Sequence, residues 1–120
     1  MKYKISVSED GTYISIRVLE TITGEIEKEF AKFAIKEAKQ RKIRKFLVDV
    51  RGTRNIANSS EQYLLGYEDM KQFDLDKHSR IAVLVDENDN SHNFIETIMF
   101  NAGYLCSIFI DEDAALEWLG

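Results

Sequence analysis

The sequence predicts a single α/β domain over residues 1–120, with a mostly parallel mixed sheet of about five strands and an antiparallel edge strand. Two observations indicate this class. Apolar residues alternate with a period of two in the N-terminal segment and then change to helical spacing. Beyond that point, short apolar runs typical of buried parallel strands alternate with helical segments. We therefore expect the element order ββαβαβαβα.

The N-terminal segment is expected to form an antiparallel hairpin. Strand-like runs cover Tyr3–Ser8 and Thr12–Leu19, and Glu9, Asp10 and Gly11 separate them. An acidic residue followed by glycine is a strong hairpin signal, because glycine adopts a positive φ at little cost. The first strand should therefore lie at an edge of the sheet.

A first helix is predicted from Glu25 to about Gln40, and Thr23 is placed to cap it. Helical spacing predicts its buried stripe, which consists of Ile26, Phe30, Phe33, Ala34 and Ala38. A basic run follows at its end and consists of Lys39, Arg41, Lys42, Arg44 and Lys45. The helix macrodipole accounts for cations in this position, and a patch for an anionic surface is the alternative.

Two strand–helix units come next. The first has a buried strand at Phe46–Val50 and a helix from about Ser60 to Phe73. Asn58 or Ser59 is placed to cap this helix, with Glu61 in position for a capping box. The second unit has a strand at Ile81–Val85, a polar loop, and a helix at Asn93–Ala102 whose expected inward residues are Phe94, Ile95, Ile98 and Met99.

The C-terminal part is predicted to contain a strand at Leu105–Ile110 and a short final helix. Gly103 should end the preceding helix, and Asp111 should cap the last one. The residues expected to pack down from this last helix are Leu116, Trp118 and Leu119. Right-handed crossovers would make the later strands parallel and place most helices on one face of the sheet.

Composition excludes several classes of protein. The net charge is −5 with a pI near 5.1, which disfavours a nucleic-acid protein held by phosphate contacts. No apolar stretch approaches the ~18 residues of a membrane span, and the start of the sequence does not resemble a signal peptide. The lone cysteine, Cys106, leaves no partner for an intramolecular disulfide. We expect a cytoplasmic protein.

At this stage the sequence resembles the STAS superfamily, and in particular its SpoIIAA-like branch of small bacterial proteins. One stretch that carries the likeness is the strand Phe46–Val50 followed by Asn58, Ser59, Ser60 and a helix. The other runs from Ile95 through Phe109 into the acidic and apolar tail Asp111–Leu119. The fold of this branch is also similar to that of CRAL-TRIO lipid-transfer domains.

The resemblance implies a role for the turn at Asn58, Ser59 and Ser60. In anti-sigma-factor antagonists of the family, a partner kinase phosphorylates a serine in an Asp-Ser-Ser-Gly turn at this place. Here Asn58 stands in place of the aspartate and Glu61 in place of the glycine. A phosphoacceptor and a simple helix cap are the two interpretations of this turn.

Other polar residues offer weaker candidates. Asp49, Asp86 and Asp111 fall at the C-terminal ends of predicted strands, where open α/β sheets bind ligands and where paired carboxylates can hold Mg²⁺. The alternative is that they end strands or, for Asp111, cap a helix. His78 and His92 are expected at the surface. These residues form no recognisable catalytic or metal-binding set, so we predict no enzyme activity, no metal and no cofactor.

The strand at 81–85 is apolar on both faces, with Val83 and Val85 on one side and Ala82 and Leu84 on the other. Helices on one face would leave the second face uncovered. We therefore expect a homodimer, or an apolar ligand held between sheet and helices. The predicted function is a non-enzymatic regulatory or protein-interaction module with a protein partner. The alternative is a small carrier of an apolar molecule or lipid.

Overall fold

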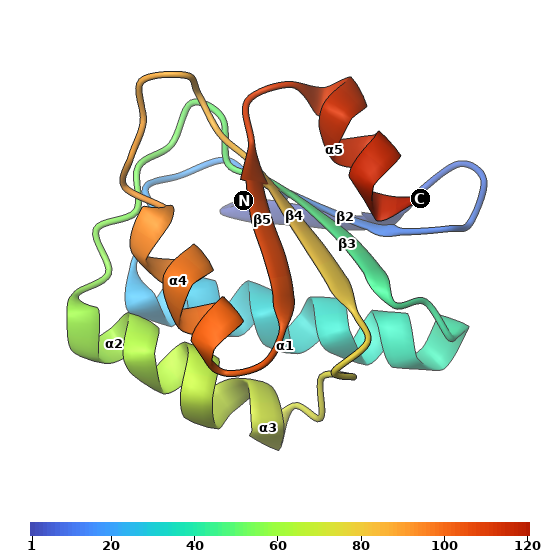
Figure 1. The fold of residues 1–120 in the computed structure, drawn as a ribbon, viewed down its shortest axis with the longest axis horizontal. Coiled ribbons are helices and arrows are strands. Elements are labelled where there is room, and N and C mark those ends of the chain that lie inside the picture. Colours follow the sequence, from blue (N-terminus) through green and yellow to red (C-terminus); the bar gives the residue numbers. More distant parts are fainter.

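The computed structural model describes all of residues 1–120 as a five-stranded sheet with three continuous helices on one face and one helix on the other (Figure 1). The strands are β1 (Tyr3–Val7), β2 (Ile14–Val18), β3 (Lys45–Asp49), β4 (Arg80–Leu84) and β5 (Leu105–Phe109). The helices are α1 (Gly24–Arg41), α2 (Ser59–Leu64), the π-helical η1 (Leu65–Asp69), α3 (Met70–Gln72), α4 (Asn93–Asn101) and α5 (Glu112–Leu119). The predicted fold class is confirmed.

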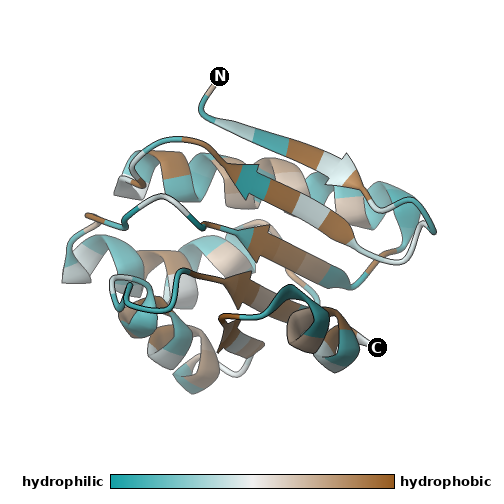
Figure 2. Cartoon of the chain, turned by 90° about the horizontal axis from the view of Figure 1, so that it is seen from above, coloured by the Kyte–Doolittle hydropathy of each residue, from teal (hydrophilic) through white to brown (hydrophobic).

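The strands follow their chain order across the sheet, β1-β2-β3-β4-β5. β1 and β2 form the antiparallel hairpin at the edge, with Ile5 opposite Ile16, and Gly11 turns the loop with a φ of 76°. The pairs β2–β3, β3–β4 and β4–β5 are all parallel. The hairpin strands alternate in hydropathy, whereas β3 and β4 are hydrophobic along most of their length (Figure 2).

The main core lies between the sheet and the helices α1 to α4, and contains 22 buried residues. Thr23 caps α1 as predicted, since its hydroxyl accepts a hydrogen bond from Ile26 N at 3.2 Å. The predicted stripe of α1 was wrong in one position, because Phe33 is 48% exposed. The buried face is rotated toward Glu27 and Ile35 instead.

The helix predicted at 60–73 is continuous but not uniform. Its middle, Leu65–Asp69, is π-helical, and the N–H of Met70 donates to the carbonyl of Leu65. In α4 the inward residues Ile95, Ile98 and Met99 are buried as predicted. Phe94 was predicted inward and is 41% exposed.

The second face of the sheet is covered by the chain's own α5, so the expectation that it would be left open was wrong (Figure 1). Asp111 caps α5 as predicted, accepting from Ala114 N at 3.1 Å. Ala115 and Leu119 pack on Leu47 and Leu84 of the sheet. The apolar second face therefore gives no reason for dimerisation, and the homodimer stays a prediction without this support.

None of the helices combines the length and apolarity that crossing a membrane requires.

Candidate functional site

The two strand-end aspartates predicted as a ligand edge are engaged within the chain. Asp49 pairs with Arg17 and Arg51, whose guanidinium nitrogens lie 2.8 Å from its two carboxylate oxygens. Burial acts to raise the pKa of Asp49, but the hydrogen bonds from Arg51 and the charge of Arg17 outweigh it and hold the pKa below its usual value. Asp86 accepts from Gly52 N at 2.6 Å. Both carboxylates fix the loop after β3.

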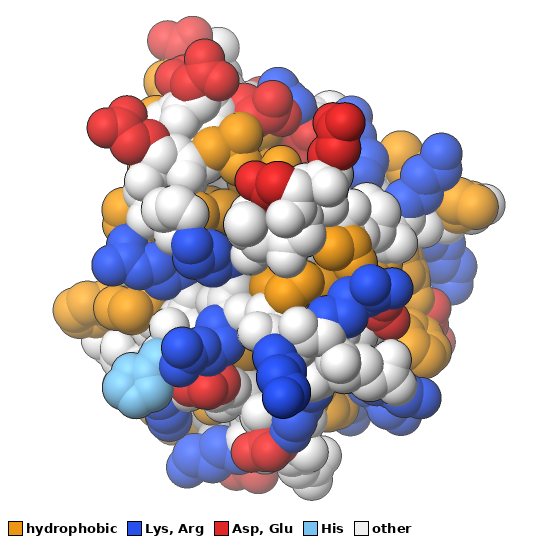
Figure 3. Space-filling model, turned by 90° about the vertical axis from the view of Figure 1, so that its right-hand side faces the viewer, with side chains coloured by type: hydrophobic (Ala, Val, Ile, Leu, Met, Phe, Trp, Pro, Cys, Tyr) orange, Lys and Arg blue, Asp and Glu red, His pale blue; other side chains and the backbone are white.

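The basic run at the end of α1 lies on the face at the amino ends of the parallel strands. Lys39 pairs with Asp74, and Arg41 pairs with Glu37 at 2.6 Å. Lys45 of the run and two other cations of this face, Lys77 and Arg80, donate to carbonyl groups at the ends of helices, at Gly120, Ala102 and Trp118 respectively. Basic side chains there are interspersed with acidic and uncharged ones (Figure 3). These pairings favour the structural interpretation of the run.

The turn at Asn58, Ser59 and Ser60 begins α2 and lies at the surface. Asn58 is the cap: its side chain accepts from Glu61 N at 2.8 Å, and the Glu61 carboxylate accepts from Asn58 N at 3.0 Å. This capping box uses neither serine hydroxyl. Ser59 and Ser60 are therefore exposed in the first turn of α2 without a capping role.

Apolar side chains surround these two serines. Ser59, Ser60, Tyr63, Leu64 and Phe94 line one shallow hollow between α2 and α4, which we call the α2–α4 patch. Three large apolar side chains form the patch: Tyr63 is 53% exposed, Leu64 is 52% exposed and Phe94 is 41% exposed. The Tyr63 ring is held against the Tyr67 ring at a centroid distance of 4.5 Å. The patch is thus an apolar surface that contains two free hydroxyl groups.

A second polar group, missed by the sequence analysis, lies beneath the surface at the carboxyl edge of the sheet. Glu27, in the first turn of α1, is only 6% exposed, and its Oε2 accepts from Asn55 Nδ2 at 2.9 Å. A short bridge between Ile22 and Asn55 brings the two connecting loops together. Glu27 Oε1 has no hydrogen-bond partner. Burial raises the pKa of Glu27 to about 7.

His92 was predicted at the surface, and this was wrong: it is 2% exposed. The polar loop after β4 folds back, so that the residue before α4 turns inward over the sheet edge. Its Nε2 lies 3.3 Å from Asp89 Oδ2 and 3.5 Å from the Thr53 carbonyl oxygen. Burial lowers the pKa of His92, so the neutral ring is favoured near pH 7. Both neighbours of Nε2 are acceptors, which places the proton of the neutral ring there.

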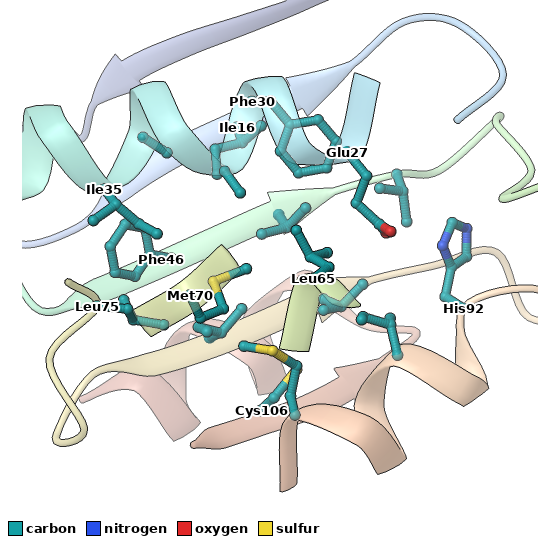
Figure 4. Close-up of a pocket in the computed structure, with 18 of the residues that line it drawn as sticks. Ile16, Glu27, Phe30, Ile35, Phe46, Leu65, Met70, Leu75, His92 and Cys106 are labelled. Atoms are coloured by element: carbon teal, nitrogen blue, oxygen red, sulfur yellow. The ribbon is translucent and has the colours of Figure 1, made fainter. Parts of the chain in front are cut away.

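Glu27 and His92 are the two polar residues among the 19 that line a cavity of about 80 Å³ between the sheet and the helices. The other 17 are hydrophobic, and they come from strands β2 to β5, from helices α1, η1, α3 and α4, and from the adjoining loops. The carboxyl group and the imidazole ring point toward one another at one end of this cavity (Figure 4). The site combines an apolar chamber with one polar end.

A sequence signal for Glu27 was present. Positions 27, 30, 31, 34 and 38 share one face of a helix, because they are three or four residues apart. Four of them are Phe or Ala, so Glu27 lies in an apolar stripe. His92 offered no comparable signal, since its burial depends on how a loop folds.

The strand order and the placement of the helices define a SpoIIAA-like fold of the STAS type. The chain superposes with a TM-score of 0.60 on an uncharacterised protein of the DUF3478 family from Shewanella loihica PV-4, which has a SpoIIAA-like fold. The two share 18% sequence identity, over 98% of this chain and 92% of that chain. This likeness shows the fold and no more. No protein-family model and no curated protein matches the sequence significantly.

Proposed function

We propose that the chain is a non-enzymatic protein-interaction module that binds a regulatory protein partner through the α2–α4 patch. The exposure of Tyr63, Leu64 and Phe94 in one hollow supports this proposal most directly. Aromatic side chains that are half exposed and held in place are typical anchors of protein interfaces. The SpoIIAA-like fold is consistent with such a role.

The serines in the patch give the interaction a means of control. A phosphate on Ser59 or Ser60 would bring about −1.5 to −2 charges to the first turn of α2. The positive end of the helix dipole would tolerate this charge, so α2 would stay folded. The apolar contact beside it would become hydrated. We therefore propose that phosphorylation lowers the affinity of the patch for its partner.

Site-specific photo-crosslinking in the cells that make the protein tests this function. A benzophenone amino acid replaces Tyr63 in the patch, and Phe33 is the matched control because it is an aromatic residue of similar exposure on α1. We expect one defined protein to be crosslinked at 63 and not at 33. Ser60→Asp should lower the yield about tenfold, which corresponds to ~1.4 kcal/mol of affinity, while Ser60→Ala should leave it unchanged.

The crosslinked protein must then bind in purified form. Binding that is lost in Leu64→Asp but kept in Phe33→Asp would support the patch as the interface. Equal crosslinking at both positions, or equal binding by both aspartate variants, would contradict the proposal.

A second candidate function is the binding of a small molecule, which the cavity beside Glu27 and His92 favours. Its volume of about 80 Å³ is ~half that of an engineered protein cavity known to take benzene. A lipid chain would therefore fit only if the helices moved apart. The predicted carrier role is supported in the restricted form of a small ligand.

A further inference from the structure

The cavity contains an unexplained polar atom. Two buried side-chain oxygens of the chain have no hydrogen-bond partner, Glu27 Oε1 and Gln62 Oε1, and of these two residues Glu27 lines the cavity. Buried polar atoms without partners are rare in folded proteins, and each one calls for an explanation such as a bound water or ion, stored strain or a functional role. The Glu27 carboxyl group points along the cavity toward its His92 end (Figure 4).

We propose, building on the second candidate function above, that this cavity is a binding site for a small uncharged molecule with an apolar body and one hydroxyl or carbonyl group, which forms a hydrogen bond with Glu27 Oε1.

The size and the lining of the cavity determine this class of ligand. A protein cavity of ~150 Å³ binds benzene, which has six non-hydrogen atoms, so a cavity of about 80 Å³ suits a molecule of roughly three or four. With 17 of the 19 lining residues hydrophobic, water makes few contacts there and a charged ligand loses its hydration. An apolar body with one polar group matches both parts of the site.

The protonation of Glu27 decides which polar group binds. Oε2 already accepts from Asn55, so the proton of the neutral carboxyl group lies on Oε1 and can be donated into the cavity. Once ionised, the same oxygen can only accept. The titratable groups around Glu27 come from three elements: Glu61 from α2, His92 with its neighbour Asp89 from the loop after β4, and the neutral thiol of Cys106 from β5.

A hydroxyl group can therefore bind both forms of Glu27, whereas a carbonyl group can bind only the protonated form. Burial raises the pKa of Glu27 to about 7, within reach of experiment. Glu61 is also acidic, and burial lowers the pKa of His92, so neither supplies a positive charge that would keep Glu27 ionised near pH 7.

The wall of the cavity includes the π-helical segment of the chain. Leu65 begins η1 and Met70 follows it, and both line the cavity. π-Helical segments are rare and occur often at functional sites, because they interrupt the regular hydrogen bonding of a helix.

Acetone and 2-propanol form a matched pair of probes, since they have the same size and differ in the ability to donate a hydrogen bond. Titration is followed by methyl NMR of the protein at pH 6 and pH 8, with nuclear Overhauser contacts from each probe to Ile95 and Met99 as the readout of site. We expect acetone to bind about tenfold more weakly at pH 8 than at pH 6, and 2-propanol to change by less than about threefold.

Two variants separate Glu27 from the rest of the molecule. In Glu27→Gln the amide always donates, so acetone should bind equally at both pH values. Glu25→Gln changes an exposed carboxylate in the same helical turn and should behave as the unchanged protein. The proposal is overturned if neither probe contacts Ile95 or Met99, if only water is found beside Oε1, or if the pH dependence of acetone persists in Glu27→Gln.

Discussion

At the scale of single residues, the most informative feature is a carboxyl group held where water cannot reach it. Glu27 has one hydrogen bond, from Asn55, and one oxygen without a partner. Ionised carboxylates are strongly disfavoured in such surroundings, which is the cause of its raised pKa. The chain thus contains an acid that changes charge near neutral pH.

This shift predicts a pH dependence of stability. The pKa rises from 4.5 to about 7 on folding, so between these values the folded chain keeps a proton that the unfolded chain releases. The contribution of Glu27 to the free energy of unfolding is fully present below about pH 4.5, falls as the pH rises, and is lost above about pH 7. Glu27→Gln lacks this titration. The free energy of unfolding of the variant minus that of the unchanged protein should therefore rise by about 2–3 kcal/mol from pH 5 to pH 8.

Urea unfolding of both proteins at the two pH values measures this difference. His92 also titrates, and its lowered pKa gives the opposite slope in the acid range. Its contribution is common to both proteins and cancels in the comparison. Unfolding free energies that run parallel from pH 5 to pH 8 would show that Glu27 has an ordinary pKa.

At the scale of elements, the contact between η1 and α4 is unusually close. Gly66 lies in η1, and a Cβ atom added there would lie 2.3 Å from Ile98 Cγ2. Real Cβ atoms do not approach a neighbour so closely, so the Ile98 side chain or one of the two helices must shift if the glycine is replaced. The absence of a side chain at this position allows the π-helical segment to pack on α4.

Gly66→Ala should therefore destabilise the protein by about 1–3 kcal/mol, as overpacked cores do. Without the clash, alanine in a helix would instead stabilise by ~1 kcal/mol, so the sign of the change is diagnostic. Leucine has no Cγ2 branch, and Ile98→Leu in the same chain should recover most of the loss. A double-mutant cycle of unfolding free energies measures the coupling. Additive effects would contradict the close contact.

At the β5 edge of the sheet, a side chain of α4 forms a hydrogen bond with the strand backbone. Glu96 of α4 accepts a hydrogen bond from Ile108 N at 2.8 Å. This N–H lies in the edge strand β5, so the carboxylate occupies a group that another strand would otherwise pair with. The edge is thereby protected within the chain.

At the scale of the whole molecule, α5 is the one helix that covers the second face of the sheet. Leu47, Ala82 and Leu84 form its floor, and Ala115 and Leu119 cover them. The Trp118 ring adds to the cover, at a centroid distance of 5.5 Å from Phe109. The same apolar residues that suggested a dimer in the sequence are satisfied within one chain.

Removal of residues 112–120 should convert this face into a surface for self-association. We expect the shortened chain to elute from size-exclusion chromatography as concentration-dependent oligomers, because a large exposed apolar patch drives association. Leu119→Ala keeps α5 and should cost about 2–4 kcal/mol of stability without a change in oligomeric state. A shortened chain with the oligomeric state of the full one would show that α5 is not the essential cover.

The sequence by itself determined the order of strands and helices and the caps at Thr23 and Asp111, because these features depend on residues a few positions apart. Right-handed crossovers then placed the helices on one face. The serine turn was also recognisable, and the structure added that Asn58, rather than a serine, is the cap.

Only the tertiary structure decided which residues lose contact with water. His92 is buried because a loop folds over the sheet edge, and Phe94 is exposed because α4 packs with a rotation that its own sequence does not fix. Glu27 of α1 meets Asn55, a loop residue 28 positions away in the sequence. Burial depends on the joint packing of distant segments, so the cavity with its polar end could not be predicted from local patterns.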